Sequence, residues 1–213
     1  QEATYFTQKI VAQRFDVNYS PDFQKGVLEQ ALVRMQKALK KASLEKQTSN
    51  WLDKNLAQFI DVFKKHQELT PLSQEIIQRL SKQVKAQQGA IFLNTEVLGQ
   101  ARLKLVAGYA LSRERYQKRN ILAHEGLLGQ ALKNRNSIYL DQLPENYNWI
   151  EMGLGNTPPR SLFICPIQIN EETLGVIELS SLYCFDLHHQ QIVERIADYM
   201  AWFIARKNIQ TNP

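Results

Sequence analysis

Residues 158–181 read PPRSLFICPIQINEETLGVIELSS and contain two apolar runs separated by a short polar step. The runs 161–169 and 172–181 each have the length of a strand, and Asn170 and Glu171 lie between them. This pattern is typical of two antiparallel strands joined by a tight turn. Within the second run, Glu178 alternates with Ile177 and Leu179, so its carboxylate is expected on the opposite face, against either a cavity or water.

The hydrophobic period changes on both sides of this hairpin, which predicts further strands and helices. The expected elements are strands over 89–93 and 103–109, a helix over 126–134, a strand over 137–140, a loop over 146–157 and a terminal helix over 188–207. The two earlier strands are expected to pair across a connection near 94–100. The order of elements predicts an α+β fold with a largely antiparallel sheet.

Further upstream, apolar residues step by four and three positions, which is the spacing of a coiled-coil seam. The seam consists of Leu28, Leu32, Met35, Leu39 and Ala42. The pattern weakens over 43–50, a second helix is expected over 51–63, and Thr70 with Pro71 is expected to open a third. We therefore expect a helical connector over 1–48 and a folded sensor domain over 49–208.

Composition restricts the class of protein. The chain has 213 residues, 44% of them hydrophobic, and a formal charge of +5, which suits one buried domain with an appendage. No apolar run is long enough to span a bilayer, and two cysteines make no disulfide framework, so we expect a cytoplasmic protein without direct membrane contact. The basic residues near the N-terminus alternate with the seam and are expected to be a solvated helix face, so no nucleic-acid partner is predicted.

Known catalytic spacings are absent from the sequence, including GxxxxGK[ST], GxGxxG, HExxH and GxSxG. Cys165 and Cys184 lack a neighbouring basic residue that would favour the thiolate. Both are expected to be packed and to react slowly with thiol reagents. The sequence predicts neither an enzyme nor a metal site.

The loop over 147–160 combines large side chains with glycines, as the lining of a small-molecule site often does. We expect a binding site between this loop and the neighbouring strands. The candidate residues are Tyr139, Tyr147, Trp149, Met152, Arg160, Phe163, Cys165, Val176 and Glu178. A small, partly polar molecule suits such a site better than a nucleotide, because no glycine-rich phosphate cradle is present. The alternative is that the aromatic side chains fill the space themselves.

Five stretches together carry a family resemblance. They are GAIFLN (89–94), LKLVAGYA (103–110), EGLLGQALKNRNSIYLDQLP (125–144), the hairpin 158–181 and QQIVERIADYMAWFIARK (190–207). In this order they resemble the GAF domain family. The resemblance implies a six-stranded antiparallel sheet, with the helix that enters the domain and the terminal helix on one face and a ligand-capable cavity on the other. It also implies a sensory or regulatory module, commonly dimeric and coupled to an effector such as a kinase or cyclase.

Departures from the family's better-defined branches leave the ligand and any cofactor unknown. His189 and Gln190 stand where the cyclic-nucleotide branch has its acidic pair. Bilin-binding members attach their chromophore through a cysteine close to histidine, a context that Cys165 and Cys184 lack. The family's free methionine sulfoxide reductases use several reactive cysteines, and this chain has two.

The sequence as a whole predicts a non-enzymatic small-molecule sensor that passes its ligand state through its helices. We expect a homodimer and, since the chain begins at Gln1, a longer protein bearing the effector domain. The expected interface residues are Leu28, Leu32, Met35, Leu39, Ile192, Ile196, Met200 and Phe203. Two alternatives remain open: a ligand-free dimerisation or spacer module, and a thiol-based redox enzyme on the same fold.

Overall fold

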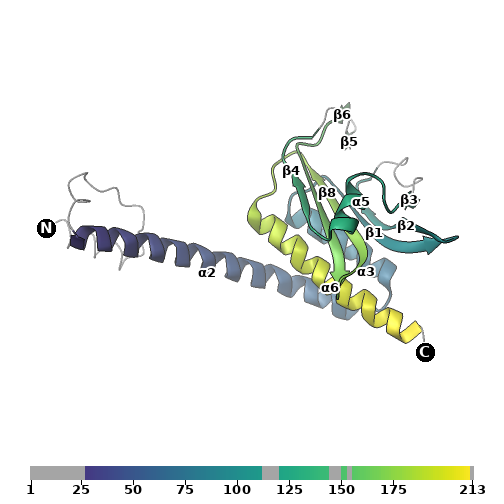
Figure 1. The fold of residues 1–213 in the computed structure, drawn as a ribbon, viewed down its shortest axis with the longest axis horizontal. Coiled ribbons are helices and arrows are strands. Elements are labelled where there is room, and N and C mark those ends of the chain that lie inside the picture. Colours follow the sequence, from purple (N-terminus) through teal and green to yellow (C-terminus); the bar gives the residue numbers. More distant parts are fainter. Residues whose placement is uncertain (1–26, 112–119, 144–149, 153–154, 212–213) are drawn as a thin grey trace. The chain divides into compact units, whose positions relative to one another are not determined.

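The computed structural model of the chain describes residues 27–111, 120–143, 150–152 and 155–211 (Figure 1). Residues 1–53 and 54–213 form two compact units. The helices are α2 (Val27–Lys65), α3 (Leu69–Gln83), α5 (Gly126–Asn134) and α6 (Leu187–Thr211). The strands are β1 (Gln88–Val97), β2 (Gln100–Tyr109), β3 (Asn120–Leu122), β4 (Ile138–Leu140), β5 (Ile150–Met152), β6 (Gly155–Thr157), β7 (Ser161–Ile169) and β8 (Glu172–Ser181).

The N-terminal helices differ from the prediction. Residues 27–65 form one helix, where the weakened pattern over 43–50 predicted a break. That stretch contains no glycine or proline, and the hydroxyl of Thr48 donates a hydrogen bond to the carbonyl oxygen of Leu44 at 2.9 Å, so the polar residues continue the helix. The predicted start at Thr70 is also wrong: α3 begins at Leu69, with Glu68 in the N-cap position.

The main sheet has six strands in the order β3-β2-β1-β8-β7-β4, and every pairing is antiparallel. The predicted α+β fold with a six-stranded antiparallel sheet is confirmed. The hairpin of β7 and β8 has the predicted bounds, and Asn170 and Glu171 make the turn with φ of 47° and 66°. Two features were not predicted from the sequence: the three-residue strand β3, and the small hairpin of β5 and β6, which lies in the segment predicted to be a loop.

One face of the sheet carries α3 and α6, and we call it the α3/α6 face (Figure 1). Ile177 at the centre of β8 lies opposite Ile91 of β1 and Cys165 of β7, and all three side chains are buried. The absence of a side chain at Gly89 lets α3 approach closely, because a Cβ there would lie 2.9 Å from the side chain of Ile77. The helix layer and the central strands therefore share one apolar core.

The other face of the sheet is covered by α5, and we call it the α5 face. Glu178 of β8 lies opposite Ala90 of β1 and Ile164 of β7, so these three residues share this face. Buried apolar residues form a continuous cluster here: Ala90, Phe92, Leu103, Leu105, Leu128, Ala131, Leu162, Ile164 and Val176. The central strands are thus buried on both faces.

A cluster of charged groups fixes the corner between α2 and α3. The carboxylate of Glu75 accepts hydrogen bonds from Nε2 of His66 at 2.6 Å, Nζ of Lys65 at 2.9 Å and Nη2 of Arg79 at 2.6 Å. The hydrogen bond from His66, followed by that from Lys65, lowers the pKa of Glu75 to about 2. The end of α2 is therefore tied to α3 through one carboxylate.

No helix within the described part of the chain is long and apolar enough to cross a membrane.

Replacing Glu75 with Gln should lower the free energy of unfolding by about 1 kcal/mol at pH 7, because three donors lose a charged acceptor. The folded-state pKa lies below the ordinary value of 4.5, so this contribution is complete above that value and is lost as the pH falls through about 2. Urea unfolding of both proteins at pH 7, 4 and 2.5 should show the difference shrinking.

The matched control is Glu96→Gln, since Glu96 is exposed near the end of β1. We expect this substitution to change stability by less than about 0.5 kcal/mol at every pH. A Glu75→Gln difference that stays constant down to pH 2.5 would contradict an ionic role for the cluster.

Candidate functional site

The predicted ligand-binding residues do not share one face of the sheet. Phe163 and Cys165 of β7 lie opposite Leu179 and Ile177 of β8, which places both on the α3/α6 face. Tyr139 lies opposite Phe163, and their ring centroids are 6.5 Å apart. A joint lining with Val176 and Glu178 is therefore wrong for Tyr139, Phe163 and Cys165. Side chains alternate between the two faces of the sheet along a strand. Glu178 therefore lies on the opposite face from Phe163 and Cys165, and the three cannot line one cavity.

Four other candidates come from the segment before β7. Tyr147 and Trp149 lie outside the described residues. Met152 ends the short strand β5, and its side chain is also outside the described part. Arg160 is exposed just before β7, where its backbone N–H donates to the carbonyl oxygen of Ser181 at 2.8 Å. Their part in a site stays a prediction.

Val176 and Glu178 lie together on the α5 face. Glu178 is only 4% exposed, although the residues opposite it, Ala90 and Ile164, are apolar. A carboxylate in such surroundings is costly unless it accepts hydrogen bonds. Glu178 does take part in an interaction within the chain, and among the predicted ligand-binding residues it is the polar candidate on the α5 face.

The two cysteines differ in exposure. Cys165 is buried, and burial raises the pKa of its thiol to about 12. Cys184 is exposed, which corrects the prediction that it is packed. It follows the end of β8 and lies near Tyr139, whose pKa is raised first by burial and then by this thiol. Among the described residues, no group of three His, Cys, Asp or Glu could hold a metal ion.

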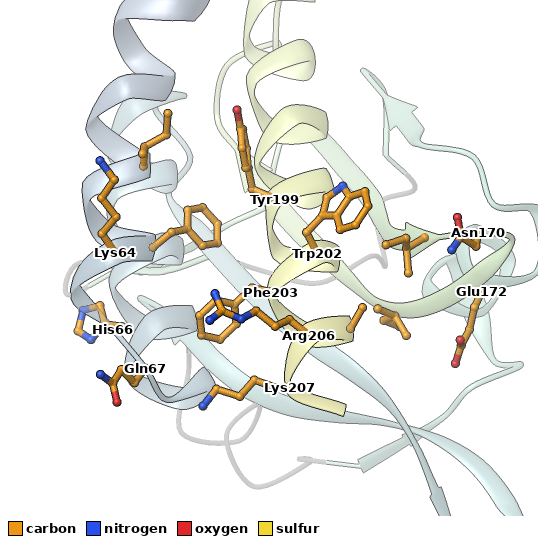
Figure 2. Close-up of a pocket in the computed structure, with 15 residues that line it drawn as sticks. Lys64, His66, Gln67, Asn170, Glu172, Tyr199, Trp202, Phe203, Arg206 and Lys207 are labelled. Atoms are coloured by element: carbon orange, nitrogen blue, oxygen red, sulfur yellow. The ribbon is translucent and has the colours of Figure 1, made fainter. Parts of the chain in front are cut away.

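A groove of about 1360 Å³ lies elsewhere, between the end of α2, the end of α6 and the turn from β7 to β8 (Figure 2). Aromatic side chains dominate its apolar lining. The ring of Phe63 lies 5.8 Å from that of Tyr199 and 6.3 Å from that of Phe203. Trp202 lies on the side of α6 towards Asn170 (Figure 2) and is 69% exposed. Polar groups border the groove: Lys64, His66, Gln67, Asn170, Glu172, Arg206 and Lys207.

This groove was not identified from the sequence as a site. A signal was present, because Tyr199, Trp202 and Phe203 bring three aromatic rings into one turn and a half of the terminal helix. Which of these rings are exposed depends on how α6 packs against the sheet, and this is a property of the tertiary structure.

The predicted interface residues of the terminal helix need correction. Ile192, Ile196 and Met200 are 0% exposed, because they pack within the domain itself. They are therefore not available to a second chain, and the prediction is wrong for these three. Phe203 is half-buried and lines the groove.

The residues of the N-terminal seam are more exposed than the predicted interface residues of the terminal helix. Met35 and Leu39 are 44% and 39% exposed, and Leu32 is half-buried. The side chain of Leu28 lies outside the described part. Their role in an interface remains a prediction.

Comparisons with solved structures find the same fold in GAF domains and in a reductase. The GAF domain of a phosphoenolpyruvate-protein phosphotransferase from Coxiella burnetii is 20% identical with a TM-score of 0.64, covering 76% of this chain and 97% of that one. A GAF domain/HD domain protein from Geobacter sulfurreducens is 12% identical with a TM-score of 0.52, covering 72% and 98%. A free methionine-R-sulfoxide reductase from Neisseria meningitidis, solved with its substrate, is 14% identical with a TM-score of 0.57, covering 71% and 87%.

At these identities the solved structures establish the fold alone. No curated protein is detectably similar to the sequence. Residues 66–205, however, match the GAF domain family, and they contain α3, the whole main sheet and most of α6. This match covers well over half of the chain, which therefore belongs to the GAF domain family.

Proposed function

We propose that this chain is a non-enzymatic regulatory module that binds a small molecule on the α5 face and passes its ligand state to other parts of a signalling protein through its helices. GAF domains of signalling proteins are typically regulatory sensors. The observation that carries the proposal is that Glu178, a carboxylate only 4% exposed, shares the α5 face with a cluster of buried apolar residues. In this proposal, 49–208 form the sensor and 1–48 the connector, in a homodimer coupled to an effector domain.

The central strands offer a physical route from ligand to helices. Val176 and Glu178 face α5, whereas Ile177, between them, packs under the α3/α6 layer. A ligand that shifts β8 on one face therefore changes the packing surface on the other, because a close-packed core does not absorb displacements. Such a ligand acts by binding one arrangement of the helices more tightly than another.

The chemistry of the anchor narrows the ligand class. The carboxylate oxygens of Glu178 accept hydrogen bonds, so the residue suits an amine, hydroxyl or amide donor on the ligand. The neighbouring side chains are apolar, so the rest of the molecule should be apolar as well. We therefore expect a small molecule with a donor group on an apolar body.

A metabolite screen by thermal unfolding tests this function. A true ligand should raise the melting temperature by about 5–10 °C at roughly 100 times its Kd, because it binds only the native state. The same compound should stabilise Glu178→Gln far less, since the amide keeps the shape but not the charge. Glu172→Gln is the matched control, because Glu172 is exposed in the adjoining turn region and should respond like the unmodified chain.

The alternative is a ligand-free dimerisation or spacer module. It is favoured by the α5 face itself, where nine buried apolar residues already pack together. If no compound stabilises the protein and a crystal structure shows side chains filling the space beside Glu178, the sensor proposal fails and this alternative replaces it.

Thiol labelling tests the redox alternative. Cys184 is exposed and should react within minutes in the native protein, whereas Cys165 should react only on unfolding, since burial raises its pKa to about 12. Cys184→Ser should therefore leave no fast-reacting thiol. Rapid native labelling in that variant would show a reactive Cys165 and would revive an enzymatic role.

A further inference from the structure

We propose that the groove between the ends of α2 and α6 binds a short acidic peptide segment of a partner protein, one that carries large apolar side chains. The inference goes beyond the proposed function, which concerns a small molecule on the α5 face. The residues that line the groove and those of the α5 cluster do not overlap, so the two sites are separate.

The size of the groove is the first observation. Its volume of about 1360 Å³ exceeds the roughly 300–1000 Å³ of a typical small-molecule pocket. The lining comes from three parts of the chain: the end of α2, the last turns of α6 and the turn from β7 to β8. A peptide segment is long enough to contact all three parts at once, whereas a small metabolite would leave much of the lining uncovered.

The aromatic side chains of the groove are the second observation. Trp202 is 69% exposed and Tyr199 is 42% exposed, and Phe63 and Phe203 are half-buried. Arg206 lines the same groove and is exposed. Tryptophan, tyrosine and arginine are the residues that most often carry the binding energy of protein interfaces. The groove therefore has the composition of a protein-binding surface, and its rings can receive apolar side chains of a peptide.

The distribution of charge around these rings is the third observation. Figure 2 shows the side chains of Arg206 and Lys207 extending from α6 towards the end of α2, whereas Glu172 lies on the opposite side of α6. Lys64 lines the groove from α2 and is exposed. A guanidinium group can bind a carboxylate through two parallel hydrogen bonds. The end of the groove formed by the two helices is therefore complementary to acidic side chains.

Other occupants suit these features less well. A nucleic acid or an anionic lipid surface binds to basic groups spread over a broad surface. The described lining of the groove has three lysine or arginine side chains, together with the carboxylate of Glu172. The proposed homodimer does not require the groove, because Met35 and Leu39 of the N-terminal seam are exposed. A peptide of mixed apolar and acidic character matches both the rings and the charges.

Selection of short random peptides, displayed on phage, against the purified full chain tests the partner class. The enriched peptides should have a net negative charge and at least two large apolar side chains. Synthetic copies should bind with micromolar affinity in fluorescence polarisation. Copies in which lysine replaces each acidic residue should bind at least about tenfold more weakly, because Arg206 and Lys207 repel them.

A charge variant then tests the basic end of the groove. Arg206→Gln should weaken binding of the acidic peptides at least about fivefold, and raising the salt concentration should affect this variant less than the unmodified chain. Lys133→Gln removes the same charge from an exposed position on α5 and is the matched control. We expect this control to bind the peptides like the unmodified chain.

An aromatic variant tests the rings. Trp202→Ala should weaken peptide binding at least about tenfold, because it removes a large anchor surface. Tyr183→Ala is the control, since Tyr183 is 63% exposed and does not line the groove. Both residues are exposed, so both variants should keep the melting temperature of the unmodified chain.

Sedimentation of the same variants distinguishes a peptide from a second copy. A dimer that is lost in Trp202→Ala but kept in Tyr183→Ala would assign the groove to a second copy and overturn the inference. Enrichment of no peptide or of basic peptides would overturn it as well, as would binding that both Arg206→Gln and Trp202→Ala leave unchanged. Acidic peptides whose binding falls in these two variants, and not in the two controls, support it.

Discussion

The burial of β1, β8 and β7 on both faces is the constraint on which the rest of the structure depends. Ile177 at the centre of β8 is fully buried against the helix layer, and Glu178, the next residue, is buried against the α5 cluster. In such strands successive side chains alternate between the two cores. A shift of a single residue in register would exchange the two cores and drive Glu178 into the helix layer.

This two-sided arrangement connects the α5 face with the helix layer through the sheet. A molecule held at Glu178 would touch strands whose reverse side supports α3 and α6. The helices are not independent of each other, since Glu75 ties the end of α2 to α3 and Phe63 packs against Tyr199 and Phe203 of α6. The α5 face, the sheet and the helices are thus joined by continuous packing, which is the physical requirement for coupling between sites.

The helix layer also explains why the terminal helix has two different apolar faces. Ile192, Ile196 and Met200 are consumed by the domain's own core, whereas Tyr199 and Trp202 remain exposed. The exposed rings of Tyr199 and Trp202 line the groove between α2 and α6.

The sequence by itself determined the hairpin 161–181, the short helix 126–134 and the class of fold, because strand and helix periodicities are local properties of the chain. It also placed Glu178 on the face opposite Ile177. It did not determine that Phe163 and Cys165 lie across the sheet from Val176 and Glu178, because that follows from the pairing register of β7 with β8. Nor could it separate the buried face of α6 from the exposed one, or show that α2 continues through 43–50. Those outcomes depend on which surfaces meet, and only the tertiary structure decides which apolar residues are covered and which are left exposed.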